Sequence, residues 1–290
     1  MKLCRFQSAN GTSFGVLKDG WLYDLTTVDP VGFKNLDSAY AEAGADVSAL
    51  VALLEDGAKK AQKIEYEERL LKIPLEAPEI WAAGVTYLRS REARETETKS
   101  KGIYDRVYEA VRPELFVKDT GLRCRGPGEE IRVRSDSKWS VPEPELTVVF
   151  DEETRVVGYT VGNDVSSRDI EGENPLYLPQ AKVYQGSSAI GPVVTTADEI
   201  SDPQRLEIKM KILRDGEVAF QGAVNTSQMK RSVAELAEYL RRDNILRRFT
   251  LLMTGTSIVP PDDFTLQDGD TVEIEIESIG LLRNTVVQPH

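Results

Sequence analysis

Three carboxylates near the middle of the sequence have the types and spacing of a metal site. In 142–150 (PEPELTVVF) the alternation of a strand would place Glu143 and Glu145 on one face and apolar residues on the other. A returning strand at 156–161 could bring Asp164 to the same edge. Because oxygen ligands of this kind favour magnesium, calcium or manganese, the three side chains could bind one divalent cation.

The alternative is a solvated strand, because surface strands often carry glutamates without a metal. Asp164 favours the metal interpretation, since it ends a mostly apolar run in which a lone carboxylate would be costly to bury. From the spacing alone, both interpretations stay open.

The composition is that of a globular protein. With 290 residues, 40% of them hydrophobic, the chain can form one large domain and one small one. A formal net charge of -12 argues against nucleic acid or an anionic membrane as the main partner. Cys4 and Cys124 form neither a metal-ligand pair nor a disulfide framework, and neither a signal peptide nor an apolar stretch of roughly 20 residues is present. We therefore expect a cytoplasmic protein.

The sequence holds a single histidine, His290, at its last position. Chain ends are commonly frayed, so this residue is a poor candidate for a site. Mechanisms that need a Ser-His or Cys-His dyad, or a histidine-rich zinc site, therefore lack their central residue.

The pattern along the chain predicts an α+β protein. We expect a small N-terminal α/β domain at 1–75, with short strands in 1–30 and helices at 37–55 and 59–71. Two prolines in 73–78 indicate an extended linker. The remainder, 76–290, reads as a catalytic domain that is mostly β with one helix near its end.

A segment at about 87–111 could cover the site. Residues 89–101 contain almost nothing apolar, whereas apolar residues recur at helical spacing from Ile103 to Val111. One interpretation is a solvated surface helix, and the other is a lid whose apolar stripe closes over the site.

Five blocks of the sequence carry a resemblance to a known family. They are Glu143-x-Glu145, 158–169 (GYTVGNDVSSRD), Lys182 before Gly191-Pro192, 254–256 (TGT), and Gly269-Asp270 to Asn284. Their order and character resemble the fumarylacetoacetate hydrolase family over about residues 78–288. Three further stretches are 104–116, 134–137 (RSDS) and 173–180 (ENPLYLPQ). They are similar to the family's branch of 2-keto-3-deoxy-D-arabinonate dehydratases, and this likeness extends more weakly through the N-terminal module.

The resemblance implies a mixed β-roll that follows the small N-terminal module. It implies one divalent cation, usually magnesium with calcium or manganese as possible substitutes, bound by Glu143, Glu145 and Asp164. A 2-oxo acid would chelate that ion, and the chain would form a homo-oligomer, a dimer or tetramer. Hydrolytic members use a His-Glu pair near the lid, which this chain lacks. The absence of a histidine near the lid argues against hydrolysis of a diketone and fits a reaction in which water is a product.

Lys182 and Glu114 are the expected catalytic pair. A cation at the keto oxygen makes the neighbouring C3 proton more acidic, so a base suffices to remove it. We expect Lys182 to be that base, with its pKa lowered near the cation, and Glu114 to protonate the departing C4 hydroxyl. Lys182 could instead form a salt bridge to an acidic ligand, and Glu114 could pair with Arg112 or Lys118. The two residues could also exchange roles.

The substrate carboxylate has three candidate partners. Gly255 would permit close approach, and Thr256 could contribute a backbone N–H group and a hydroxyl. An ordinary glycine turn is the alternative. Arg112 could bind the substrate or pair with Glu114.

These residues and the resemblance together predict a magnesium-dependent dehydratase. It would convert a 2-keto-3-deoxy pentonate to 2,5-dioxopentanoate, and this reaction would belong to pentose catabolism. Oxaloacetate decarboxylation and acylpyruvate hydrolysis are alternatives within the family. A catalytically idle protein that binds a sugar acid is the alternative from another class.

Overall fold

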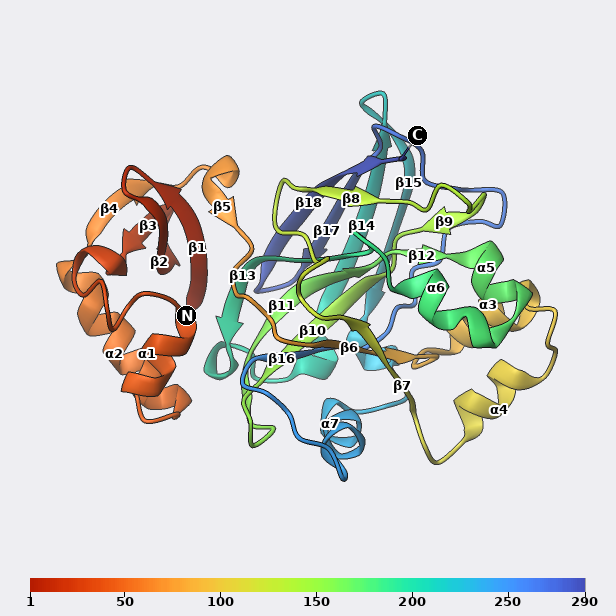
Figure 1. Ribbon diagram of the computed structural model, residues 1–290, viewed down its shortest axis with the longest axis horizontal. Helices are drawn as coiled ribbons and strands as arrows, with labels where there is room; N and C mark the ends of the chain where they lie inside the picture. Colours follow the sequence, from red (N-terminus) through yellow and green to blue (C-terminus); the bar gives the residue numbers. More distant parts are fainter. Residues whose placement is uncertain (290) are drawn as a thin grey trace.

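The computed structural model describes residues 1–289, and it has the α+β architecture that the sequence predicts. Figure 1 shows the N-terminal module at one end of the molecule, two sheets in the middle and helices α3 and α4 at the other end. The single histidine, His290, lies outside the described residues.

The larger sheet has 11 strands and runs through both parts of the chain. Its β1 pairs with β13, with Lys2 opposite Thr195 and Leu3 opposite Val194. The N-terminal strands are thus hydrogen-bonded to the main body, and a division at 75/76 stays a prediction. In order across the sheet, the strands are β4 (Gln62–Glu65), β3 (Trp21–Asp24), β2 (Gly11–Lys18), β1 (Lys2–Ser8), β13 (Ser188–Thr196), β11 (Val156–Asp164), β10 (Pro144–Phe150), β16 (Thr250–Met253), β6 (Ile80–Gly84) and β7 (Glu114–Asp119), while β5 (Leu71–Lys72) pairs with β1.

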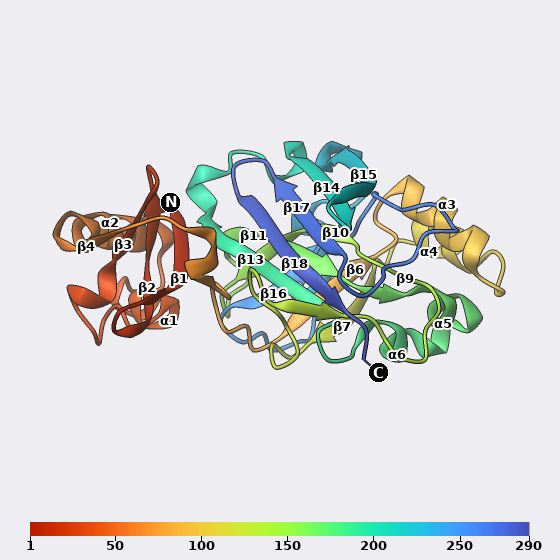
Figure 2. The same cartoon turned by 90° about the horizontal axis from the view of Figure 1, so that it is seen from above.

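A five-stranded sheet lies across the larger one, as the view from above in Figure 2 shows. Leu146 and Val148 of β10 share a buried apolar cluster with Ile208 and Ile274 of this second sheet. Asp215-Gly216 forms the turn of a hairpin between two paired strands of this sheet. Its strands are β15 (Glu217–Asn225), β14 (Glu207–Arg214), β17 (Thr271–Ile276), β18 (Gly280–Val287) and β8 (Glu130–Arg132), and a separate pair is formed by β12 (Ser166–Ser167) and β9 (Ser140–Val141).

The N-terminal helices differ in part from the expectation. The segment 37–55 is helical but divided, since Gly44 and Ala45 adopt positive φ angles of 68° and 57°. The helix predicted at 59–71 is wrong beyond Lys60, because the chain turns into β4 and pairs Ile64 with Leu22. Sheet pairing overrides local helix preference here. The helices are α1 (Leu36–Glu42), α2 (Val47–Lys60), α3 (Leu88–Glu97), α4 (Ile103–Glu109), α5 (Arg168–Glu173), α6 (Leu178–Lys182) and α7 (Val233–Arg241).

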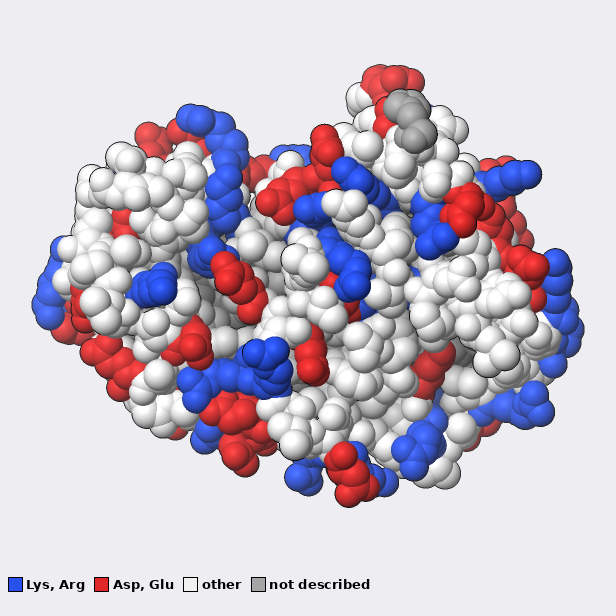
Figure 3. All heavy atoms as spheres, in the orientation of Figure 1, with Lys and Arg blue, Asp and Glu red and all other residues white. Residues whose placement is uncertain are grey.

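Acidic and basic side chains are interspersed on the face that Figure 3 shows. None of the helices within 1–289 combines the length and the apolar character needed to cross a membrane. Both cysteines, Cys4 and Cys124, are free and buried.

Candidate active site

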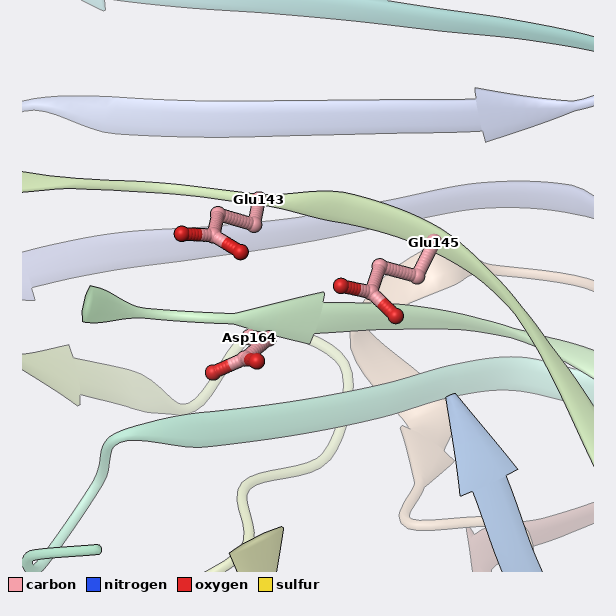
Figure 4. A group of neighbouring side chains, drawn as sticks. All are labelled: Glu143, Glu145 and Asp164. Carbon is pink, nitrogen blue, oxygen red and sulfur yellow. The ribbon is translucent and has the colours of Figure 1, made fainter. Parts of the chain in front are cut away.

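The β10–β11 pair brings the three predicted carboxylates together. Glu143 directly precedes β10, Glu145 lies within it and Asp164 ends β11, where its N–H donates to the Glu143 carbonyl at 2.9 Å. Each residue offers one carboxylate oxygen within 4.8 Å of the others. Figure 4 shows the three side chains grouped beside the two strands. All three are buried, so the solvated-strand alternative does not describe this structure.

Glu145 is the carboxylate whose charge the protein balances least. Burial, followed by the charges of Asp164 and Glu143, raises its pKa well above the ordinary value. Its Oε2 accepts a hydrogen bond from the N–H of Gly255 at 2.6 Å. Within residues 1–289 it forms no ion pair, because Lys182 lies at 3.0 Å from Glu143 and 3.2 Å from Asp164 instead. Excess negative charge on hard oxygen donors fits a divalent cation such as magnesium.

Lys182, at the end of α6, lies against these carboxylates. Besides its two ion pairs, its Nζ donates to the hydroxyl of Ser166 at 2.6 Å. Burial lowers the pKa of Lys182, but the charges of Asp164 and Glu143 outweigh it and raise the pKa. The decrease expected beside a bound cation stays a prediction. The salt bridge that the sequence left as the alternative is present.

Lys118 is a site residue that the sequence analysis considered only as a partner of Glu114. It is fully buried on β7, and its Nζ lies 2.6 Å from Oδ1 of Asp164. Its Nζ also donates to the carbonyl of Val165 at 3.0 Å. Asp164 is therefore held between two ammonium groups.

Glu114 begins β7 and faces Gly84 of the neighbouring strand β6. Burial, and then the charge of Glu171, raises its pKa to about 7. Neither expected structural partner reaches it: Lys118 pairs with Asp164, and Arg112 lies over the Tyr239 ring at 5.5 Å from its centroid. A carboxyl group with this pKa can both give and take a proton near neutral pH.

The three candidate carboxylate binders are placed differently. Gly255 and Thr256 line the same pocket as Glu114 and Lys182. Gly255 has a φ of +98°, and a Cβ there would lie 2.0 Å from Oγ1 of Thr86. Arg112 is exposed on the surface, and the structure does not bring it to the pocket.

The sequence analysis did not predict the network of buried charges that adjoins the three carboxylates. Arg94 of α3 lies 2.5 Å from Glu143, 2.9 Å from Glu97 and 3.2 Å from Glu171. Arg168 of α5 lies 2.7 Å from Glu97 and 3.2 Å from Glu143. Burial opposes the charge of Arg94, but Glu171 and Glu143 outweigh it and raise its pKa. The one signal in the sequence is the polar segment 89–101 itself, whose charges need partners wherever they are buried.

The pocket formed by these groups is narrow. Its free volume, about 20 Å³, is near that of a single water molecule or ion. Its lining includes Ser90 and Arg94 of α3 as well as Gly255 and Thr256. A sugar acid would need more room, which motivates the lid interpretation of 87–111.

The sequence matches one family model, "Fumarylacetoacetate (FAA) hydrolase C-terminal", over residues 79–287. A probable 2-keto-3-deoxyxylonate dehydratase of Haloferax volcanii is 49% identical over 271 residues, 93% of each chain. A 2-dehydro-3-deoxy-D-arabinonate dehydratase of Saccharolobus solfataricus is 44% identical and covers 93% of this chain and 94% of its own.

Solved structures show the same likeness in three dimensions. A 2-keto-3-deoxy-D-arabinonate dehydratase complexed with magnesium and 2,5-dioxopentanoate superimposes with a TM-score of 0.83 at 38% identity, and all of both chains is covered. This agreement confirms the expected fold class. The family model, the two relatives and the shared architecture together show that the chain belongs to the fumarylacetoacetate hydrolase family.

Proposed function

We propose that this protein dehydrates a 2-keto-3-deoxy pentonate, of the 2-keto-3-deoxy-D-arabinonate type, to 2,5-dioxopentanoate. The observation that carries the proposal is that one buried pocket is lined jointly by three clustered carboxylates, Glu114 and Lys182. The names of the relatives and of the superimposed structure support the same reaction.

Glu143, Glu145 and Asp164 would hold magnesium, for which calcium or manganese could substitute. When bound, the ion would polarise the 2-oxo group and neutralise the carboxylates that raise the pKa of Lys182. The backbone N–H group and the hydroxyl of Thr256 would hold the substrate carboxylate, and Gly255 would permit its close approach.

Lys182 and Glu114 would carry out the proton transfers. Lys182 would take a proton from C3, and Glu114, whose pKa is about 7, would protonate the C4 hydroxyl as it leaves. The C3 proton and the C4 hydroxyl leave as one water molecule. Later proton shifts convert the C5 alcohol to an aldehyde and leave C3 and C4 as CH2 groups. Electrons balance within the substrate, so no external oxidant is required.

We further propose that the protein acts in the cytoplasm, within pentose catabolism, as a homo-oligomer of two or four copies. The free buried thiols of Cys4 and Cys124 suit a reducing compartment. The oligomer rests on the family resemblance, and light scattering on the purified protein tests it.

The activity is tested with purified protein, magnesium and 2-keto-3-deoxy-D-arabinonate, with the aldehyde followed by a coupled dehydrogenase. We expect turnover that EDTA abolishes and added magnesium restores. Parallel assays use oxaloacetate and an acylpyruvate. Turnover of either of these alone would replace the dehydratase by a decarboxylase or hydrolase, and binding without any turnover would indicate a catalytically idle sugar-acid binder.

A further inference from the structure

The end of the pocket beside helix α3 holds a network of buried charges. Glu97, Glu143 and Glu171 share the two guanidinium groups of Arg94 and Arg168. Glu143 also pairs with Lys182 at 3.0 Å, whereas Glu171, within residues 1–289, pairs with Arg94 alone. A second carboxylate brought beside Glu171 would meet a like charge at short range, and in a buried site such contacts are poorly screened.

Glu171 is one of three members of this network that line the pocket, together with Arg94 and Glu143. The residue is 4% exposed. Its Oε2 lies 3.2 Å from Nη1 of Arg94, yet among the described residues it accepts no hydrogen bond. A buried carboxylate oxygen without a donor is costly, and a hydroxyl group would satisfy it.

The order of groups along the pocket sets which end of a substrate would reach Glu171. Gly255 donates to Glu145, and Glu145 belongs to the carboxylate cluster with Glu143. Glu143 in turn pairs with Arg94, whose guanidinium also faces Glu171. With the substrate carboxylate at Gly255 and the 2-oxo group at the cluster, carbons C3 to C5 extend towards α3.

We propose that Glu171 determines specificity by accepting a hydrogen bond from the C5 hydroxyl and by excluding substrates with a carboxylate at that position. The proposal rests on the proposed function for the orientation of the substrate. It predicts that the protein prefers a monoanionic sugar acid over dicarboxylic 2-oxo acids. Hydrogen-bonding sites of this kind discriminate more strongly than apolar pockets.

Two five-carbon probes isolate the charge at C5. 2-Oxoglutarate has the skeleton of the proposed substrate with a carboxylate at C5, and 2-oxopentanoate has a methyl group there. Their dissociation constants are measured by calorimetry on magnesium-loaded protein. We expect wild-type protein to bind 2-oxopentanoate at least tenfold more tightly, and Glu171→Gln to reduce that ratio at least tenfold. Glu171→Asp, which keeps the charge, should preserve it.

The matched control is Glu173→Gln, an exposed glutamate on the same helix. It should leave both constants unchanged. Glu171→Gln should also raise KM for 2-keto-3-deoxy-D-arabinonate while the magnesium affinity stays constant. An unchanged ratio in Glu171→Gln would overturn the proposal, and so would a loss of both ligands together with magnesium, which would assign Glu171 a purely structural role. Binding of the probes needs no turnover, so failure of the dehydratase assay alone leaves this test intact.

Discussion

Arg94 on helix α3 donates to the carboxylate of Glu143 at 2.5 Å. A helix that covers the pocket is thus ion-paired to a candidate metal ligand, and both side chains are buried. If 88–109 is a lid, any movement of α3 that admits a substrate must break or shift this pair. The proposed metal site and the proposed lid would then be coupled through this contact.

Replacing Arg94 tests whether this contact holds the lid. Arg94→Leu leaves Glu171 without a buried cation, although Glu143 keeps its pairs with Arg168 and Lys182. Breaking a buried pair costs about 3–5 kcal/mol. We expect hydrogen exchange across 88–109 to accelerate, and kcat/KM to fall at least tenfold. Arg91→Leu is the control in the same helix, because Arg91 pairs at 3.4 Å with a half-exposed Asp105 and such pairs contribute about 1 kcal/mol or less. Equal exchange rates in the two variants would contradict the lid.

Removing one candidate ligand tests the metal site without reference to activity. Magnesium at 100 times its Kd should stabilise the native protein by about 2.7 kcal/mol and raise Tm by several degrees. Glu145→Gln should lose this magnesium-dependent shift, whereas the exposed Glu217→Gln should keep it. Differential scanning calorimetry with EDTA and magnesium measures both. A full shift in Glu145→Gln would remove that residue from the ligand set.

The pattern of local alternation indicated that the three carboxylates could lie together, but it left a solvated strand open as the alternative. Glu143 precedes β10, Glu145 lies in it and Asp164 ends the paired strand β11, so their proximity follows from one hairpin. Glu114 and Lys182 were found through the family resemblance instead. Nothing local predicts that they face the same pocket.

Contacts between distant segments explain what the sequence analysis missed. The polar segment 89–101 reads as solvated, yet Arg94 is buried because carboxylates from β10 and α5 surround it. The 59–71 segment reads as helical, but pairing with β3 makes part of it a strand. Arg112 was expected either to bind the substrate or to pair with Glu114. It lies two residues before β7, and its guanidinium group lies over the ring of Tyr239 instead.

The pKa of Glu114, raised from 4.5 to about 7, predicts a defined pH dependence of stability. Between these values the folded state binds more protons than the unfolded state, so the free energy of unfolding should decrease as pH rises from about 4.5 to 7. At most about 3 kcal/mol is lost over this interval, and Glu114→Gln should lack that component. Urea denaturation of both proteins at several pH values measures it.

The same group predicts the pH dependence of catalysis. If Glu114 is the proton donor, activity should fall as pH rises above about 7 and its carboxyl loses the proton. Glu114→Gln should reduce kcat by about 10²–10⁴-fold while the magnesium-induced shift in Tm persists. An alkaline limb that survives in the residual activity of this variant would assign the limb to another group.

Gly84 fixes the position of the Glu114 carboxylate from the neighbouring strand. A Cβ at position 84 would lie 2.1 Å from Oε2 of Glu114, so Gly84→Ala must rotate that flexible side chain away. A displacement of about 1 Å can cost about 100-fold in rate, and we expect a loss of kcat on that scale with magnesium binding unchanged. The pKa seen in the stability profile should move back towards 4.5 as the carboxyl group gains solvent.

A double-mutant cycle separates this effect from damage to the strand. In the Glu114→Gln background the proposed catalytic carboxyl is already absent, so Gly84→Ala should cause almost no further loss of kcat. The two single losses would then be strongly non-additive. If Gly84→Ala lowered kcat by the same factor in both backgrounds, the substitution would be acting on β6 itself, and the positioning role of Gly84 would be rejected.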